Sequence, residues 1–528
     1  GVVNMVSKRP LQEAQREVGV QFGSFGRKQI QADLTGPLNA DGSLSYRLIA
    51  LQRKSDTQVD YVPDDRSVIA PSLTWRPNAM TSLTLQGLWQ KDKSGSSSQF
   101  LPWQGTLLPN PNGRLPSSRF IGEPGDYYDS ERKTFGWQFE HKFNDSWTFR
   151  QNFRYARNEN DNRYHYGAAF SGAESWDATD PIFKRVLGRY YDSSLTRNRT
   201  QTLDNHVEGH FQTGALKHTL LVGADFARQR ENVWVGTTYD TIDVYAPVYG
   251  HLDEPVRDAR PRTRQRQTGV YLQDQIKLDN WIFVAGLRHD RAVSSAAGSE
   301  SDTSSATTKR FGVMYASPSG WSPYVSYSES FTPQSAREGR IFKPLRGEQW
   351  EVGVKYEPKD RAVAFSAAVY DLREKNQIAE PQPKVFTQLG QTKTRGVELE
   401  AKGSIGPNLD FVAHYNYTDA DALIEGLPKH QASVWAKYKF SIGGVNGFSA
   451  GAGVRMMSSF RDMQSGVGPR IPGVALADLV FAYETAAWRY ALNINNVTDK
   501  VYFSTCLSRG DCWYGARRNI VASATYRF

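Results

Sequence analysis

The sequence predicts an all-β protein, a transmembrane antiparallel β-barrel of about 22 strands with short periplasmic turns and long extracellular loops. Three observations predict this fold. Long segments alternate apolar and polar residues with a period of two, short and long connections alternate between these segments, and the chain ends in an amphipathic segment whose last residue is Phe528. Because successive side chains of a strand point to opposite faces, a period of two separates a lipid face from a lumen face.

Composition and charge narrow the class of protein. The 528 residues are 39% hydrophobic, the mean hydropathy is −0.57, and no run approaches the roughly 18 apolar residues of a membrane helix. This excludes a helical membrane protein but not a barrel, whose lumen face is polar. The 12% aromatic content suits girdles at the two membrane interfaces, and would equally suit a large extracellular β protein. The net charge of +9 is spread along the chain, so nucleic acid is not expected as a partner, whereas anionic lipid headgroups or an anionic small ligand are compatible with it.

The first ten residues differ in pattern from the rest of the chain. Residues 1–10 have the character of the tail of an earlier segment, and no secretory signal peptide precedes them, so we expect a processed or truncated N-terminus. From about Glu17 the two-residue pattern takes over. Short turns are predicted at Gly36-Pro37, Asp41-Gly42, Arg76-Pro77-Asn78, Asn144-Asp145, Asp279-Asn280 and Pro358-Lys359-Asp360. Long polar, aromatic-rich loops are predicted at about 94–133, 160–197, 231–263 and 292–308.

Segments 83–90, 146–155 and 409–418 show the alternation clearly. Their more apolar faces consist of Leu83, Leu85 and Trp89, of Trp147, Phe149, Phe153 and Tyr155, and of Leu409, Phe411, Ala413, Tyr415 and Tyr417. The predicted strands run to roughly ten residues or more, the length that crosses a bilayer when tilted, whereas the strands of a β-sandwich run to about five or six. A barrel of this width has a lumen that needs a plug, and no segment of this sequence could fill it.

The end of the chain predicts the strand that closes the barrel. In residues 515–528, one face carries Ile520, Ala522, Ala524, Tyr526 and Phe528, and the other carries Val521, Ser523, Thr525 and Arg527. A strand at the end of a chain leaves an open hydrogen-bonding edge unless it pairs with another strand of the same chain. The alternative is an ordinary strand at the edge of a sheet.

Cysteines and histidines offer few sites for chemistry. Cys506 and Cys512, the only two cysteines, fit a small surface-loop disulfide in an oxidising compartment, and no nearby His completes a zinc site. His206, Glu208 and His210 would share one face of a strand and could hold a metal ion, but a polar stripe facing the lumen has the same spacing, and we expect no metal site. The sequence has no nucleophile elbow, HExxH motif or phosphate loop, so we expect no enzyme and no cofactor.

A set of motifs spans the whole chain. It comprises residues 1–10 (GVVNMVSKRP), 45–48 (SYRL), 69–77 (IAPSLTWRP), 267–275 (QTGVYLQDQ), 324–331 (YVSYSESF), 351–356 (EVGVKY), 395–400 (RGVELE) and 495–502 (NNVTDKVY). The set resembles the TonB-dependent siderophore receptors, in particular the ferric hydroxamate receptors for ferrichrome and ferrioxamine. Cys506, Cys512, Trp513, Gly515, Ala516 and Arg518 are placed as in the last extracellular loop and strand of the ferrichrome receptor.

The resemblance implies a domain organisation, a place and partners. Residues 1–10 would be the C-terminal tail of an otherwise absent plug domain, and residues 11–528 the transmembrane barrel. The chain would lie in the bacterial outer membrane, as a monomer, in contact with lipopolysaccharide and outer-membrane lipid. TonB would energise transport of a ferric siderophore through the missing plug. The alternatives are a passive pore, or a barrel on which phages or bacteriocins dock.

The resemblance also implies a ligand site. A ferric hydroxamate siderophore is held through its organic rim, so the receptor needs aromatic walls and hydrogen-bond donors and no metal ligands. Transfer by position places ligand contacts at Phe100 and Tyr166, with Trp103 and Trp234 as neighbouring candidates. Other ligand positions of the relatives carry no aromatic residue here and fall on Ser98, Ala168, Val235 and Leu507. The ligand would be a ferrichrome-type or ferrioxamine-type siderophore. Because those aromatic residues are lost, a ferrioxamine-type or other ferric hydroxamate fits at least as well as ferrichrome itself.

Overall fold

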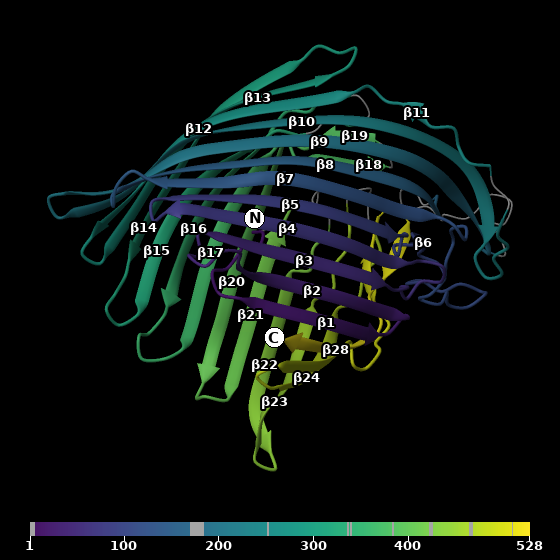
Figure 1. Cartoon of the computed structure of the whole chain (residues 1–528). Coiled ribbons are helices and arrows are strands. Elements are labelled where there is room, and N and C mark those ends of the chain that lie inside the picture. The colour runs from purple at the N-terminus through teal and green to yellow at the C-terminus, as the bar shows by residue number, and fades with distance from the viewer. Residues whose placement is uncertain are drawn as a thin grey trace.

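The chain winds into a closed antiparallel barrel (Figure 1). The computed structural model describes residues 6–168, 184–250, 253–334, 337, 340–382, 385–421, 426–463, 468–508 and 510–528. Within these ranges, no helix is long and apolar enough to cross a membrane, a finding that does not bear on strands.

One sheet forms the barrel. In the described residues it has 23 strands, one of which is the two-residue β11 (Asp258–Ala259), and the other 22 follow one another around the barrel. This confirms the predicted fold and strand number. These strands are β1 (Gln15–Gly23), β2 (Arg27–Pro37), β3 (Leu44–Lys54), β4 (Asp64–Asn78), β5 (Thr81–Ser94), β7 (Tyr127–Lys142), β8 (Trp147–Gly167), β9 (Val186–Thr213), β10 (Leu216–Asp243), β12 (Thr263–Leu278), β13 (Trp281–Ala296), β14 (Asp302–Tyr315), β15 (Trp321–Thr332), β16 (Leu345–Tyr356), β17 (Val363–Lys375), β20 (Gln391–Ile405), β21 (Leu409–Ala420), β22 (His430–Ile442), β23 (Val445–Met457), β24 (Val474–Glu484), β25 (Trp488–Asn495) and β28 (Asn519–Arg527).

The last strand closes the ring, as the sequence predicts. β28 pairs with β25 on one side and with β1 on the other, in a register that runs from Glu17 opposite Arg527 to Gly23 opposite Val521. An ion pair of 2.7 Å between Arg527 Nε and Glu17 Oε1 crosses this seam. The barrel wall therefore has no open edge at the junction of the first and last strands.

The two faces of the barrel sheet differ in polarity. Apolar side chains that remain exposed gather on the outer face, among them Val20, Phe22, Ile30, Leu48, Val222, Phe226, Tyr526 and Phe528. The inner face carries ion pairs between neighbouring strands, such as Asp33 with Arg47 at 2.7 Å and Arg150 with Glu208 at 3.1 Å. An apolar outer belt with a polar lumen is the surface that a membrane barrel presents.

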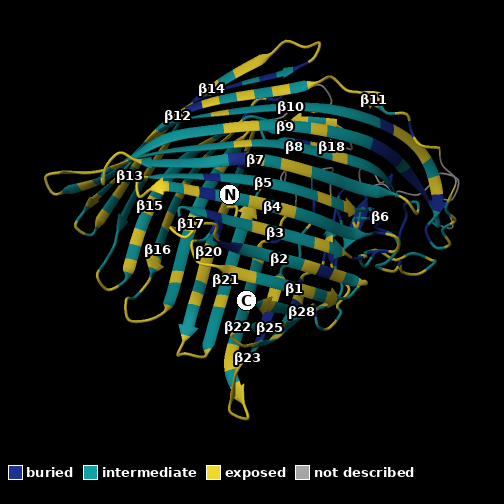
Figure 2. Ribbon diagram, in the orientation of Figure 1, coloured by how far each residue is buried: buried dark blue, intermediate teal, exposed yellow. Residues whose placement is uncertain are grey.

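Connections at the two ends of the barrel differ in length. The predicted turns at Asp41-Gly42, Asn144-Asp145, Asp279-Asn280 and Pro358-Lys359-Asp360 lie between strands at one end, whereas Gly36-Pro37 and Arg76-Pro77-Asn78 belong to the ends of β2 and β4. The opposite end, called the long-loop end, carries among others the connections 95–126, 168–185, 244–262, 458–473 and 496–518. Figure 2 shows that buried residues concentrate there, around β6 (Leu101–Pro102), because loops pack on one another while barrel strands face lipid or lumen.

Several stretches that the sequence predicts to be loops are strands. β8 continues to Gly167, β9 begins at Val186, β10 continues to Asp243, and β13 and β14 cover most of 292–308. Residues 169–183 and 251–252 of these stretches lie outside the described residues. Beyond the membrane both faces of a strand can be polar, so the alternation of apolar and polar residues disappears while the backbone ladder continues.

A disulfide-bonded hairpin organises the long-loop end. β26 (Phe503–Cys506) pairs with β27 (Asp511–Tyr514), the predicted bond joins Cys506 to Cys512, and β27 also pairs with β6 of the connection 95–126. A second small hairpin, β18 (Ile378–Gln382) with β19 (Val385–Gln388), rises from another connection.

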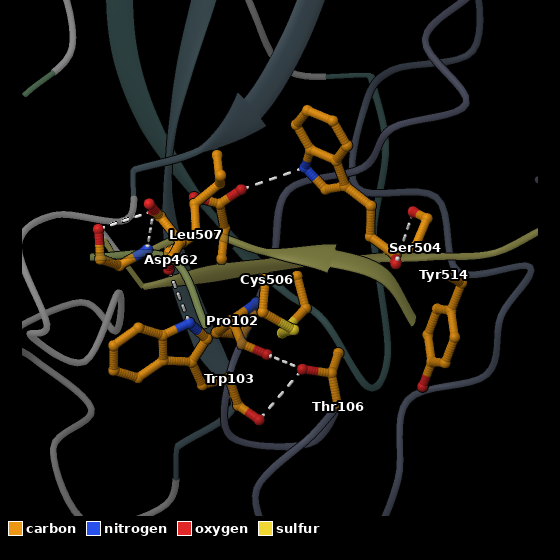
Figure 3. The surroundings of a disulfide bond; sticks show 12 residues. Pro102, Trp103, Thr106, Asp462, Ser504, Cys506, Leu507 and Tyr514 are labelled. Carbon is orange, nitrogen blue, oxygen red and sulfur yellow. Dashed lines mark hydrogen bonds between the residues drawn. A yellow bond between two sulfur atoms is a disulfide. The ribbon is translucent and has the colours of Figure 1, made fainter. Parts of the chain in front are cut away.

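The disulfide hairpin ties three connections together (Figure 3). Trp103 Nε1 of the connection 95–126 donates a 3.1 Å hydrogen bond to the carbonyl oxygen of Leu507. The Asp462 carboxylate, from the connection 458–473, accepts hydrogen bonds from the backbone N–H and the hydroxyl of Ser508 at 2.6 and 2.7 Å. The Tyr514 hydroxyl donates to the carbonyl oxygen of Leu115 at 2.6 Å. The hydrogen bonds of Trp103 and Tyr514 thereby join segments some 400 residues apart in the chain.

The closing strand can be tested with a proline. The variant Ala524→Pro removes a backbone donor from a strand that is paired on both sides, so we expect it to abolish the folded barrel. The folded form is detected by its faster migration on SDS gels before heating than after. The variant Ala524→Val keeps the N–H group and is expected to retain the fast band. A fast band in the proline variant would contradict pairing of β28 on both sides.

The disulfide can be tested by removing it. The double variant Cys506→Ser, Cys512→Ser should lose about 2 kcal/mol of local stability, because a short closed loop is opened. We expect faster proteolytic cleavage of residues 496–518, with the heat-modifiable barrel band unchanged. Equal cleavage rates, or two free thiols found in the unmodified protein by non-reducing mass spectrometry, would contradict the role given to this bond.

Candidate ligand-binding site

Three neighbouring strands stand well above the apolar belt at the long-loop end. β8 has 21 residues, and β9 and β10 have 28 each. A tilted strand needs only about 9–11 residues to cross a membrane. The upper parts of the three strands, with their uninterrupted registers, therefore form a two-faced extension outside the membrane, here called the wall (residues 158–167, 188–198 and 231–241).

The inner face of the wall is a tyrosine surface. Tyr166 of β8 lies opposite Tyr190 of β9, which lies opposite Tyr239 of β10. The ring centroids are 5.4 Å apart in the first pair and 5.8 Å in the second. Tyr164 lies 5.5 Å from Tyr166 and 4.5 Å from Tyr128 of β7. Tyr190 is an even number of residues from the lumen-facing Glu208, so these rings share the lumen side of the sheet.

Two aromatic residues from distant loops complete this surface. The Phe100 ring lies 5.4 Å from Tyr166 and 5.2 Å from Trp513, in edge-on and tilted geometries favoured by aromatic quadrupoles. Phe100 has a left-handed backbone, with φ of 50°. A Cβ at Gly167 would overlap the Phe100 carbonyl oxygen, so the absent side chain at Gly167 is what admits this loop.

A carboxylate lies among the phenols. Asp192 of β9 is 6% exposed, and its Oδ2 accepts a 3.1 Å hydrogen bond from the Tyr166 hydroxyl. Its Oδ1 accepts a 2.6 Å hydrogen bond from the Thr237 hydroxyl. Burial, and then the neighbouring Asp192 carboxylate, raise the pKa of Tyr166, so its phenol stays protonated and acts as a donor at neutral pH.

The outer face of the wall is held by the connection 95–126. The Arg189 guanidinium, which is 2% exposed, lies 2.8 Å from Asp240 and donates a 2.7 Å hydrogen bond to the carbonyl oxygen of Ile121. His165 stacks on Tyr191 at 4.1 Å and lies 2.9 Å from the Asp126 carboxylate. These buried contacts keep the wall in one position, so the tyrosine surface on its other face is preorganised.

The structure brings together two of the four predicted ligand residues. Phe100 and Tyr166 are in contact on the inner face. Trp103 is 7% exposed and packs with Ile471, Phe503 and the disulfide. Trp234 lies on the outer face of β10, an even number of residues from the exposed Phe226, with the Arg197 guanidinium 5.5 Å from its ring.

Sequence reasoning missed Tyr128, Tyr164, Tyr190, Tyr239, Trp513 and Asp192 as members of this surface. Tyr190 and Asp192 lay in a predicted loop, where side-chain direction cannot be assigned. The signal was present, since counting back in twos from Glu208 along one continuous strand places both on the lumen face. Trp513 had no such signal, because its contact with Phe100 depends on the packing of two loops.

The histidine stripe on β9 forms ion pairs in the lumen. Glu208 accepts a hydrogen bond from Arg150 at 3.1 Å and lies 3.0 Å from His210, while His206 lies 2.8 Å from Asp204. Among the described residues, no group of three or more His, Cys, Asp and Glu is arranged to hold a metal ion. The tyrosine surface instead offers ring faces, hydroxyl donors and one carboxylate, which suit an organic ligand.

Similar proteins of known role have been found by sequence. The chain is 36% identical to the ferrichrome outer membrane transporter/phage receptor of Escherichia coli K12, an alignment that covers 100% of this chain and 76% of that protein. It is 33% identical to the ferrioxamine B receptor of Salmonella typhimurium SL1344, covering 100% of this chain and 77% of that protein.

Solved structures and a family profile agree with these relatives. The fold superimposes on the ferric-catecholate import receptor Fiu of E. coli K12 with a TM-score of 0.87 at 20% identity, over 100% of this chain and 83% of that one. The profile of the family described as "TonB dependent receptor-like, beta-barrel" matches residues 74–497. The chain therefore belongs to the TonB-dependent receptor β-barrel family.

Proposed function

We propose that this chain binds a ferric hydroxamate siderophore at the tyrosine surface of the wall and, when TonB acts on the plug, passes it through the barrel. The observation that carries the proposal is the contact of Phe100, Tyr166 and Trp513, which come from three separate parts of the chain and meet on the lumen side of the long-loop end. Ring faces and phenol donors suit the organic rim of a ferric hydroxamate. The ferrichrome and ferrioxamine B receptors at 36% and 33% identity support the same ligand class.

Family membership gives the setting of this activity. The chain is an outer-membrane receptor and transporter, not an enzyme, and its ligand is the ferric siderophore rather than a resident cofactor. The apolar outer face would contact outer-membrane lipid, with lipopolysaccharide in the outer leaflet, around a monomeric barrel. The long-loop end is then the extracellular end, where a siderophore arrives.

The proposed boundary between plug and barrel is supported by the first residues. The segment proposed as the plug tail, residues 1–10, lies along the lumen side of β2 and β3 where it is described. Lys8 pairs with Asp33 at 2.7 Å, and Arg47 donates a 3.0 Å hydrogen bond to the carbonyl oxygen of Arg9. Leu11, the first residue of the proposed barrel domain, donates its N–H to the Thr35 hydroxyl at 2.9 Å. The chain therefore enters β1 from inside the lumen. A plug that fills the lumen has to be joined to the barrel in this way.

Truncating the contact residues should weaken binding. We expect Phe100→Ala and Tyr166→Ala each to raise the Kd for a ferric hydroxamate by about tenfold or more, because each removes a ring from the ligand surface. The readout is quenching of tryptophan fluorescence in a titration with ferric ferrichrome and ferric ferrioxamine B. Phe25→Ala removes an exposed phenylalanine from a short loop at the same end and serves as the control. Unchanged Kd values in both site variants would contradict the site.

Transport is tested by growth. A strain whose only hydroxamate receptor is the complete product of this gene should grow under iron limitation on at least one ferric hydroxamate, and growth should require TonB. No growth on any ferric hydroxamate would exclude the transport proposal. A large, steady conductance of the complete receptor in planar bilayers would instead favour a passive pore.

A further inference from the structure

A hollow lies at the long-loop end, beside the junction of the first and last strands. It has a volume of about 580 Å³ and is lined by parts of four connections, those between β1 and β2, between β3 and β4, 95–126 and 496–518. We call it the seam hollow and define it by Phe25, Arg114, Ser117, Arg517, Arg518 and Ile520. None of these residues belongs to the tyrosine surface.

Positive charge is in excess around the seam hollow. Arg114, Arg517 and Arg518 line it, whereas Asp499 is the only carboxylate among its described lining residues. Asp499 pairs with Arg517, with Oδ2 2.6 Å from Nη2. In the part of the chain that the structure describes, no ion pair engages Arg114 or Arg518. Three positive charges therefore face one negative charge, and this excess attracts an anion.

Neighbouring side chains hold two of the guanidinium groups in place. Asp499 accepts hydrogen bonds from Nε and Nη2 of Arg517 at 2.9 and 2.6 Å, and Arg517 Nη1 donates to the Ser117 hydroxyl at 2.8 Å. The Arg114 guanidinium lies 5.4 Å from the centroid of the Phe503 ring. Guanidinium groups bind phosphate through parallel N–H···O hydrogen bonds, and groups that are already fixed lose little conformational entropy on binding.

Part of the lining is apolar. Phe25, Val501 and Ile520 line the hollow and are 36%, 39% and 38% exposed. Ile520 lies an even number of residues from Tyr526, and therefore on the outer face of β28, close to the end of this strand at the long loops. The apolar lining thus continues the outer belt at the level where the membrane ends. A ligand that has both an anionic group and an alkyl chain matches this lining.

The turn that carries Phe25 has an unfavourable conformation. The Arg27 N–H donates a 3.3 Å hydrogen bond to the Ser24 carbonyl oxygen, and Phe25 and Gly26 have positive φ values of 59° and 63°. These values define a type I′ turn, in which Asn is favoured and a bulky residue is disfavoured at the first central position. Backbone strain of this kind clusters at ligand sites. The turn therefore points to a use for the Phe25 ring in the seam hollow.

We propose that the seam hollow binds the phosphate group of an outer-leaflet lipid. Arg114, Arg517 and Arg518 contact the phosphate. The lipid chain lies against Phe25 and Ile520. Free phosphate has the same anionic chemistry but would leave the apolar lining exposed to water. A bound lipid joins the connections 95–126 and 496–518 to the β1–β2 turn, and so holds the ends of the two strands that close the barrel. This inference goes beyond the proposed function, because it does not depend on the siderophore.

Three probes separate the contributions of phosphate and chain. The complete receptor, freed of lipid in a neutral detergent, is titrated with dioleoyl phosphatidic acid, with dioleoylglycerol and with inorganic phosphate. The readout is protection of Arg114 and Arg518 from modification by phenylglyoxal, measured by peptide mass spectrometry. We expect phosphatidic acid to bind about tenfold more tightly than either other probe, because it alone engages both the cationic and the apolar lining.

Variants assign the binding to this hollow. Arg114→Gln and Arg518→Gln should each weaken binding of phosphatidic acid by about fivefold to tenfold in native mass spectrometry. Phe25→Asn should weaken phosphatidic acid and leave inorganic phosphate unchanged, and it should keep the barrel folded because Asn is favoured in the turn. Arg361→Gln is the matched control, since it removes a charge from an exposed side chain in the turn between β16 and β17, at the other end of the barrel.

Two results overturn the proposal. One is equal affinity of the unmodified receptor for phosphatidic acid and dioleoylglycerol, and the other is unchanged affinity for phosphatidic acid in the folded arginine variants. Protection by inorganic phosphate at the same concentration as by phosphatidic acid overturns the lipid as the source of the phosphate group. Because protection is measured in the unmodified receptor, these comparisons hold even where a variant fails to fold. None of the varied residues belongs to the tyrosine surface, so binding of ferric hydroxamates should not change.

Discussion

Backbone hydrogen bonding in a medium without water is the constraint on which this structure depends. Each unpaired N–H or C=O group in hydrocarbon costs several kcal/mol, so a sheet that crosses a membrane must close on itself. Here closure is made by β28, which pairs with β1 from Glu17 opposite Arg527 to Gly23 opposite Val521. Once the ring is closed, each strand has a fixed lipid face and a fixed lumen face, so the direction of every side chain in the barrel sheet is set.

Above the membrane the same ladder serves a different purpose. β8, β9 and β10 continue far beyond the length needed to cross the bilayer. In these upper parts the two faces no longer divide into apolar and polar: one face packs against loops and the other carries the tyrosine surface. The outer face is occupied by loops through contacts such as Arg189 with Ile121 and Asp240. The inner face carries the tyrosines, with Asp192 buried among them. A surface built on paired strands is more rigid than one built on free loops, and for the proposed ligand site this rigidity would lower the entropic cost of binding.

The loops complete the tyrosine surface because cross-links hold distant segments of the chain together. The disulfide hairpin holds Trp513, and β6 beside it holds Phe100, so both rings reach the tyrosine surface from one layer. Trp103 belongs to this supporting layer, where its indole nitrogen bonds Leu507 and its ring is buried. Trp103, predicted to contact the ligand, instead packs in the layer that positions Phe100 and Trp513.

The sequence by itself determined the fold class, the closing strand, the disulfide and the asymmetry between short and long connections, because period, turn composition and cysteine spacing are local properties. Resemblance to a family predicted Phe100 and Tyr166 as ligand contacts, and the structure brings these two rings together. Only the tertiary structure decided that Tyr190, Tyr239 and Asp192 share their surface, that Trp234 faces the other side, and that Trp103 is buried. The physical reason is that a strand outside the membrane, polar on both faces, carries no periodic signal of its direction. Its register comes from neighbours in the closed barrel, and the loop contacts join residues some 400 positions apart.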